Sequence, residues 1–164
     1  MSEIDAQLAE TLRRAWADVP HDRLVGRGHP AGDFLEAYDW EVIERRAGFL
    51  RLEVVLPQHV KNPRGQLFGG FTPTYVDLVA LFTTHAGESW PEGGRPVNWL
   101  ATTNMRIDYF EPIVGPRFVI ESNIEKRRGR TVFVITRFFQ DGELAVHALT
   151  TMRAVALDRP LGDA

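Results

Sequence analysis

One acidic residue stands alone in a long apolar segment of this 164-residue chain. Between Phe71 and His85 the only formally charged side chain is that of Asp77. A carboxyl group held among apolar side chains is poorly solvated, which raises its pKa and suits it to act as a general base or a nucleophile. The same carboxyl group can instead be structural, satisfied by neighbouring polar atoms. The segment by itself leaves both roles open.

A glycine pair, Gly69 and Gly70, lies directly before this segment. Glycines let a substrate approach the backbone closely, because they carry no side chain. The first N–H groups of a helix have no acceptor within the helix and lie at the positive end of its dipole. They can therefore bind an anion or polarise a carbonyl oxygen. An ordinary glycine-rich loop gives the same pattern, so the pair gains meaning only together with Asp77 and the upstream amide donor of Asn62.

Together these groups predict hydrolysis of an ester or thioester. Asp77 would activate water or attack directly, and the backbone amides would stabilise the oxyanion. The chain has no cysteine, which excludes a thiol nucleophile, a disulfide and a thiolate metal site. The histidines form no ligand pattern, so we expect neither a metal nor a redox cofactor.

The elements that position these residues follow from the spacing of apolar side chains. Helical spacing over residues 2–18 predicts an N-terminal helix, followed by a loop rich in Gly and Pro that runs to Asp33. The segment 71–86 predicts a second helix, which should be buried because it is apolar all round. Alternating patterns predict strands over 38–46, 49–56, 99–110, 117–126, 131–139 and 144–157. The last four strands are expected to form an antiparallel meander.

This order of elements predicts an α+β fold, with one antiparallel sheet packed on a central helix. The length fits a single domain over 1–164, with residues 1–33 as an N-terminal helix and loop and 38–157 as the core. A net charge of −3 gives no sign of a nucleic-acid partner. The acidic N-terminus is unlike a signal peptide and no apolar run reaches membrane-spanning length, so we expect a cytoplasmic protein without a membrane partner.

One motif resembles the hotdog-fold acyl-CoA thioesterases, in particular the branch that includes the phenylacetate-pathway enzyme. Its residues are Asn62, Gly65, Gly69, Gly70 and Asp77. The resemblance covers residues 38–157 and includes the stretch 102–109 followed by Pro112. It implies a hotdog fold, an antiparallel sheet wrapped around the central helix, with the N-terminal helix as an addition. It also implies hydrolysis of an acyl-CoA to free acid and coenzyme A, in active sites between the subunits of a homodimer and often within a homotetramer.

The resemblance implies a role for each residue of the motif. The Gly69 amide would polarise the thioester carbonyl, Asn62 would hold the carbonyl or the water, and Asp77 would act from the neighbouring subunit. The Thr102 hydroxyl would help to position the nucleophilic water. The residues expected to contact the acyl-CoA are His59, Phe68, Gly70, Arg128 and Arg130. The two arginines lie in a basic turn, where they either bind coenzyme A phosphates or form a solvated hairpin end.

One residue departs from the family's pattern. The branch usually carries a His before the glycine pair, and this chain has Phe68. The backbone donor is unaffected, so hydrolysis is still expected. A non-catalytic acyl-CoA-binding hotdog protein is an alternative that Phe68 makes more credible. A hotdog dehydratase or hydratase is a second alternative, but that chemistry usually uses a His paired with the acid, and the helix entry has none.

Overall fold

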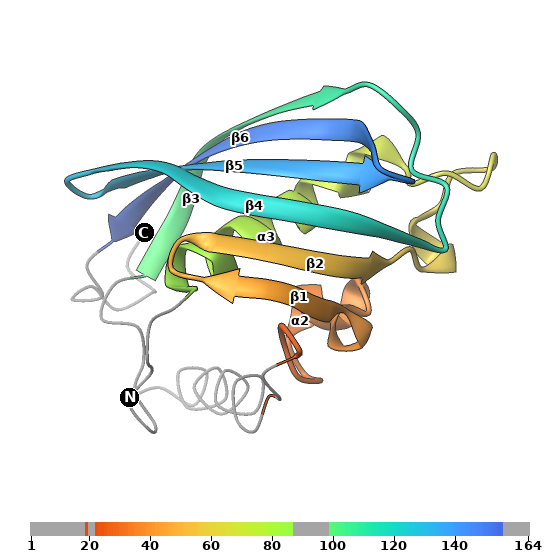
Figure 1. Ribbon diagram of the computed structural model, residues 1–164, viewed down its shortest axis with the longest axis horizontal. Coiled ribbons are helices and arrows are strands. Elements are labelled where there is room, and N and C mark those ends of the chain that lie inside the picture. The colour runs from red at the N-terminus through yellow and green to blue at the C-terminus, as the bar shows by residue number, and fades with distance from the viewer. Residues whose placement is uncertain (1–18, 20–21, 87–98, 156–164) are drawn as a thin grey trace, which may run out of the picture.

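The computed structural model describes residues 19, 22–86 and 99–155, and its six strands form one antiparallel sheet curled over the helix α3 (Figure 1). The order across the sheet is β1-β2-β4-β5-β6-β3. The strands are β1 Glu41–Arg46, β2 Phe49–Val55, β3 Trp99–Tyr109, β4 Arg117–Arg128, β5 Thr131–Gln140 and β6 Glu143–Val155. The helices are α2 Pro30–Phe34 and α3 Thr72–His85, with 3-10 turns η1 Ala37–Asp39, η2 Gln58–Val60 and η3 Gly69–Phe71. The N-terminal helix predicted over 2–18 lies outside the described residues.

The α+β fold and most predicted elements are confirmed. Except for β1, the strands and α3 agree with the predicted ranges to within two residues wherever the structure describes them. Local turn chemistry accounts for this agreement at the hairpins. Asp141 and Gly142 both have positive φ, 52° and 86°, as a two-residue turn between antiparallel strands requires. Gly48 has φ 69° in the turn between β1 and β2, where a residue with a side chain would be strained.

Two segments differ from the sequence prediction. The short helix α2 lies in a region predicted as a loop, and His29 caps its N-terminus, because the His29 Nδ1 accepts from the Gly32 N–H at 3.0 Å. Histidine is not among the residues that usually signal a helix start, so the cap was not recognised. The first strand begins at Glu41 rather than at residue 38, because η1 closes a 3-10 turn immediately before it.

The predicted meander of four consecutive strands is wrong for β3. Strands β4, β5 and β6 follow one another, but β3 lies at the sheet edge beside β6, and β4 pairs with β2. The segment 110–116 makes this crossing, and its backbone bonds successively to Ala145, Leu67 and Leu56. A connection of this length can cross the end of a sheet, whereas a two-residue hairpin joins only neighbouring strands.

An aromatic cluster fixes α3 against the concave face of the sheet. The Tyr75 ring stacks on Trp40 with centroids 5.5 Å apart and contacts the edges of Phe118 and Phe138 at 5.6 and 6.2 Å. All four side chains are buried. Burial also raises the pKa of the Tyr75 hydroxyl. The cluster lies at the start of α3, and it therefore sets the direction in which the rest of the helix presents its side chains.

The prediction that α3 is buried on all sides is wrong for one stripe in the single chain. Thr74, Leu81 and His85 are half-buried, and Asp77 between them is exposed. Spacings of three and four residues place these side chains on one face of the helix. Among the described residues, the sheet covers the other faces of α3 and does not cover this stripe. No described helix has the length and apolar character needed to cross a membrane.

The His29 cap makes helix α2 sensitive to pH. Burial lowers the pKa of His29 below its ordinary value of about 6.5, and the nearby Asp33 opposes this only in part. A histidine whose pKa is lowered by folding stabilises the folded state at pH values above its pKa in the unfolded chain. This stabilisation is lost as the pH falls through the lowered pKa of the folded state. We expect the thermal midpoint of the wild type to fall more steeply from pH 7 to pH 5 than that of His29→Asn, which keeps an acceptor but does not titrate. Parallel pH curves for the two proteins would contradict this.

Candidate active site

Asp77 and Thr102 meet where α3 crosses the edge strand β3. The Thr102 hydroxyl donates to the Asp77 carboxylate, with Oγ1 2.5 Å from Oδ1. Both residues are exposed in the single chain. The carboxylate therefore has one fixed hydrogen-bond donor and an open side toward solvent, an arrangement that leaves room for a water molecule or a substrate carbonyl.

A bulge in β3 brings Thr102 to the helix side of the sheet. The register with β6 shifts between Thr102 and Asn104, which leaves Thr103 as the extra residue. Thr102 faces the buried side chain of Met152, and Tyr109 at the far end of the strand faces the buried Val146. Without the bulge these two residues, seven positions apart, would point to opposite faces of the sheet.

The glycine turn before α3 offers backbone N–H groups. Gly69 begins η3, and its N–H finds no acceptor among the described residues. The preceding carbonyl, that of Phe68, accepts from the Phe71 N–H at 2.8 Å, so the Gly69 N–H in the same trans peptide points away from the helix. Gly69 also lines a cavity of about 300 Å³. The other lining residues are Gln66, Leu67, Thr72, Tyr109, Phe110, Glu111, Pro112, Ile113 and Val146.

Tyr109 is a residue of this site that the sequence did not single out. Its hydroxyl donates to the Gly69 carbonyl oxygen at 2.9 Å, which ties the end of β3 to the glycine turn. The signal in the sequence was the alternation of Met105, Ile107 and Tyr109, which places the three side chains on one face of β3. The bulge is what brings Thr102 to the same face.

Asn62 shapes the loop that leads to the glycine turn. Its Oδ1 accepts from the backbone N–H groups of Arg64 and Gln66 at 2.9 and 3.1 Å, and its Nδ2 donates to the Gln66 side chain at 3.3 Å. Side chains of this type commonly close such turns. Among the described residues, no hydrogen bond connects Asn62 with Asp77, Thr102 or Gly69.

His59 and Phe68 belong to a row of aromatic rings beside the glycine turn. His59 contacts the edge of Phe34, which contacts Phe71, which in turn contacts Phe68, with centroid distances of 5.1 to 5.5 Å. The His59 Nε2 donates to the Phe34 carbonyl at 2.6 Å, so this ring is tied to α2. Phe68 is 51% exposed, and its ring covers Gly70 so closely that a Cβ there would lie 2.6 Å from it. The ring therefore lies directly against Gly70, beside the glycine turn.

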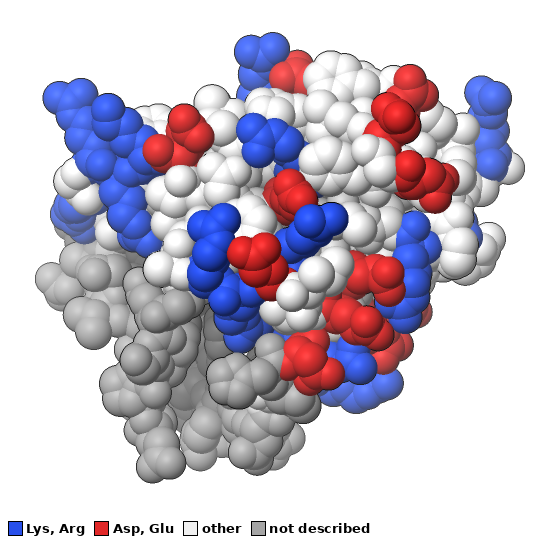
Figure 2. Space-filling model, viewed as in Figure 1, with Lys and Arg blue, Asp and Glu red and all other residues white. Residues whose placement is uncertain are grey.

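The basic turn between β4 and β5 lies at the other end of α3. Blue side chains gather over this turn in Figure 2, where Lys126, Arg127, Arg128 and Arg130 are all exposed. The Arg130 guanidinium donates to the Ala154 carbonyl at 3.1 Å, so it is partly engaged within the chain. The structure therefore places Arg128 and Arg130 far along the helix from the glycine turn of the same chain.

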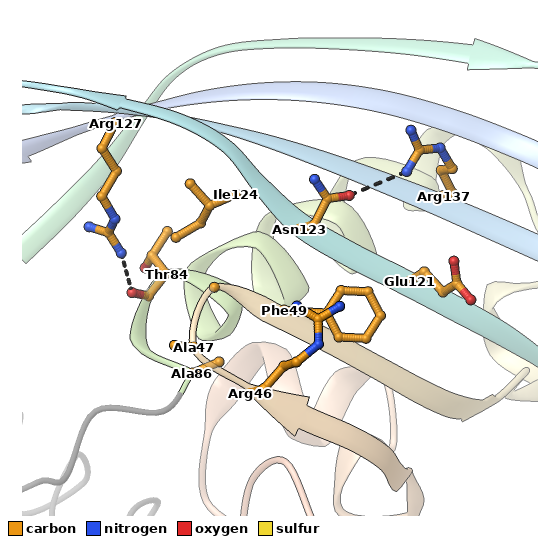
Figure 3. Close-up of a pocket in the computed structure, with 11 residues that line it drawn as sticks. Arg46, Ala47, Phe49, Thr84, Ala86, Glu121, Asn123, Ile124, Arg127 and Arg137 are labelled. Carbon is orange, nitrogen blue, oxygen red and sulfur yellow. Dashed lines mark hydrogen bonds between the residues drawn. The ribbon is translucent and has the colours of Figure 1, made fainter.

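A second cavity, of about 680 Å³, lies at the C-terminal end of α3. In Figure 3 the Arg127 guanidinium donates to the Thr84 carbonyl and the Arg137 guanidinium to the Asn123 side chain, at 2.7 and 3.3 Å. A cation at this position complements the negative end of the helix dipole. The cavity is lined by Arg46, Ala47, Gly48, Phe49, Thr84, Ala86, Glu121, Asn123, Ile124, Arg127 and Arg137. None of the residues expected from the sequence to act in catalysis lines it.

Gly69 and Asp77 of one chain are too far apart to act on one carbonyl group. Eight residues of helix rise roughly 12 Å, whereas both groups must lie about 3 Å from the reacting atoms. Among the described residues, no cluster of His, Asp or Glu side chains is placed to hold a metal ion. The arrangement supplies a carboxylate with a hydroxyl partner at one point of the helix and free amides at another.

Comparisons with known proteins find no matching family model and no matching curated protein. Solved structures do match. The phenylacetic acid degradation-related protein from Ralstonia eutropha JMP134 has a TM-score of 0.65 at 20% identity and covers 88% of this chain and 98% of its own. Thioesterase superfamily member 2 from Mus musculus has a TM-score of 0.61 at 18% identity, over 94% of this chain and 98% of its own.

A third match is a hypothetical thioesterase protein from Streptococcus pneumoniae TIGR4, whose structure contains coenzyme A. Its TM-score is 0.60 at 16% identity, over 72% of this chain and 90% of its own. Similarity at this level of identity establishes the three-dimensional fold. Together with the antiparallel sheet curled over α3, these matches show that the chain has the hotdog fold, in the form that these thioesterases share.

Proposed function

We propose that this protein hydrolyses an acyl-CoA thioester to the free acid and coenzyme A. The observation that carries the proposal is the hydrogen bond from Thr102 to Asp77, the only formally charged residue of α3. A carboxylate held by one donor and open on its other side suits attack on a thioester, either through water or directly. Support also comes from the shared fold and from the coenzyme A in the Streptococcus pneumoniae structure.

The site would form between two chains. Because Gly69 and Asp77 of one chain lie too far apart, the amide and the carboxylate acting on one thioester must come from different copies. Strand β3 is an edge strand beside the open stripe of α3, and unpaired strand edges are ready to pair with another chain. A two-fold pairing of β3 with its copy would run the two helices in opposite directions and bring each Asp77 toward the partner's glycine turn. Association of dimers into a tetramer remains a prediction.

The same pairing gives the basic turn a role. It would bring Arg128 and Arg130 of one chain toward the glycine turn of the other, where coenzyme A phosphates could bind. Arginine suits this task because its planar guanidinium matches phosphate oxygens. The reaction as proposed needs no metal or redox cofactor, and coenzyme A enters only as part of the substrate.

A non-catalytic acyl-CoA-binding protein is the second candidate, favoured by the exposed Phe68 ring beside the amides. Thiol release from a panel of acyl-CoA substrates separates the two candidates. Tight binding of an acyl-CoA without any thiol release would favour the second candidate. Formation of a hydrated product from an enoyl-CoA, without thiol release, would favour a hydratase.

The carboxylate and its partner are tested by single substitutions. We expect Asp77→Asn to lower kcat by about 10²–10⁴-fold, the usual contribution of a general base. Thr102→Val should lower kcat about tenfold through loss of one hydrogen bond, and Thr102→Ser should restore it. Thr103→Val is the matched control, because the Thr103 hydroxyl bonds to the Thr151 carbonyl and not to Asp77. Undiminished thiol release by Asp77→Asn would rule out the role given to that residue.

The Gly69 amide can be removed with little change in shape. Phe68 is extended, with φ −68° and ψ 123°, and Gly69 is the first residue of a helical turn, a position that suits proline. Gly69→Pro deletes the N–H and should lower kcat by about 10²–10³-fold. Gly69→Ala keeps the N–H, and its Cβ would meet only Tyr109 at an ordinary 3.6 Å, so most activity should remain. Equal loss in both variants would argue against an amide donor at Gly69.

Mixing two inactive proteins tests whether the site lies between chains. When Asp77→Asn and Gly69→Pro chains are unfolded together and refolded, each mixed dimer contains one site with both changes and one site with neither. Random pairing should therefore restore about a quarter of the wild-type activity. A site contained in one chain would give no recovery, because every chain would carry a defect. Mixing either variant with itself is the control.

A further inference from the structure

We propose that Tyr109 is a positioning residue, which holds the glycine turn so that the Gly70 N–H serves as a second amide donor beside that of Gly69. The proposal rests on the proposed thioesterase function and deepens it at the oxyanion position. It concerns a residue on the edge strand β3, distant in sequence from the turn that it fixes.

The Gly69 carbonyl oxygen has two partners. It accepts from the Tyr109 hydroxyl at 2.9 Å and from the backbone N–H of Thr72. A carbonyl oxygen has two lone pairs, so these two bonds together use its full capacity as an acceptor. One partner comes from the helix itself, and the other comes from a side chain of β3.

The orientation of the Gly70 N–H follows from these bonds. In a trans peptide the N–H points opposite to the C=O, so the bonds that fix the Gly69 carbonyl also aim the N–H of Gly70. The bond from Phe71 to the Phe68 carbonyl aims the Gly69 N–H in the same way. The turn thus directs two successive N–H groups away from the helix, and Tyr109 supplies the only side-chain bond that holds either peptide among the described residues.

The Tyr109 ring contributes contact as well as a hydrogen bond. A Cβ built on Gly69 would lie 3.6 Å from the ring, and both residues line the 300 Å³ cavity. Tyr109 is 52% exposed, so surrounding side chains confine its ring only in part, and the bond to Gly69 helps to fix its orientation. Strand β3 therefore carries both supporting side chains of the site: Thr102 for the carboxylate and Tyr109 for the amides.

Tyr109→Phe removes the hydroxyl and keeps the ring. Without the hydroxyl, the Gly70 N–H is expected to turn away from the oxyanion position. The loss of this donor should lower kcat about tenfold, because the amides act chiefly on the transition state. KM should stay within about twofold, and the thermal midpoint should fall by no more than a few degrees, as expected for one hydrogen bond. Tyr38→Phe is the matched control, since the Tyr38 ring contacts Arg27 at 3.7 Å and plays no part in the site. Thiol release, thermal unfolding and the mass in solution are measured for the wild type and both variants.

The outcomes distinguish this proposal from the function on which it rests. An unchanged kcat for Tyr109→Phe, with Asp77→Asn inactive, would overturn the role of Tyr109 and leave the thioesterase function standing. A fall in kcat accompanied by a lower mass in solution would also overturn it, because Tyr109 would then act through association of chains. Absence of thiol release by the wild type with any acyl-CoA would overturn both proposals. A tenfold fall in kcat alone, absent from Tyr38→Phe, supports the proposal.

Discussion

The hydrogen bond between Thr102 and Asp77 joins the central helix to the edge of the sheet, and the arrangement of the site depends on it. A charged side chain on a largely apolar helix needs either solvent or a polar partner. Asp77 has both. The Thr102 hydroxyl is its polar partner, and solvent reaches it because the sheet curls over α3 but leaves one stripe uncovered. The aromatic cluster around Tyr75 fixes the helix direction, and the bulge at Thr103 turns the hydroxyl of Thr102 toward the carboxylate. The packing of α3 and the register of β3 therefore both determine whether the hydrogen bond from Thr102 to Asp77 can form.

Much of this architecture could be predicted from the sequence, for identifiable reasons. The strands alternate regularly and end at turns such as Asp141–Gly142, whose chemistry is specific. The helix could be recognised by its length and apolar composition. The open stripe could not, because helical periodicity shows apolar residues on every side and cannot show how far a sheet wraps around them. The place of β3 at the sheet edge was also missed, since a seven-residue connection is compatible with several pairings.

Single residues were harder to predict than elements. Through a family resemblance, the Thr102 hydroxyl was expected to position the nucleophilic water, and in the structure it donates to the Asp77 carboxylate. Alternation alone would have set Thr102 and Tyr109 on opposite faces, because nothing in the sequence marks the bulge. Asn62 was expected to hold the carbonyl or the water, and within the single chain its side chain also closes the loop before the glycine turn. An Asx turn and a substrate-binding amide have the same sequence signature, so the turn could not be recognised from the sequence.

The most direct test is a crystal structure with an acyl-CoA analogue in which a methylene group replaces the thioester sulfur. The ketone of this analogue resists hydrolysis and keeps the carbonyl oxygen in place. Our account predicts that this oxygen accepts from the Gly69 amide of one chain, while the carboxylate of Asp77 from another chain faces the carbonyl carbon. A carbonyl bound away from both groups, or one contacted by Asp77 and Gly69 of the same chain, would contradict it.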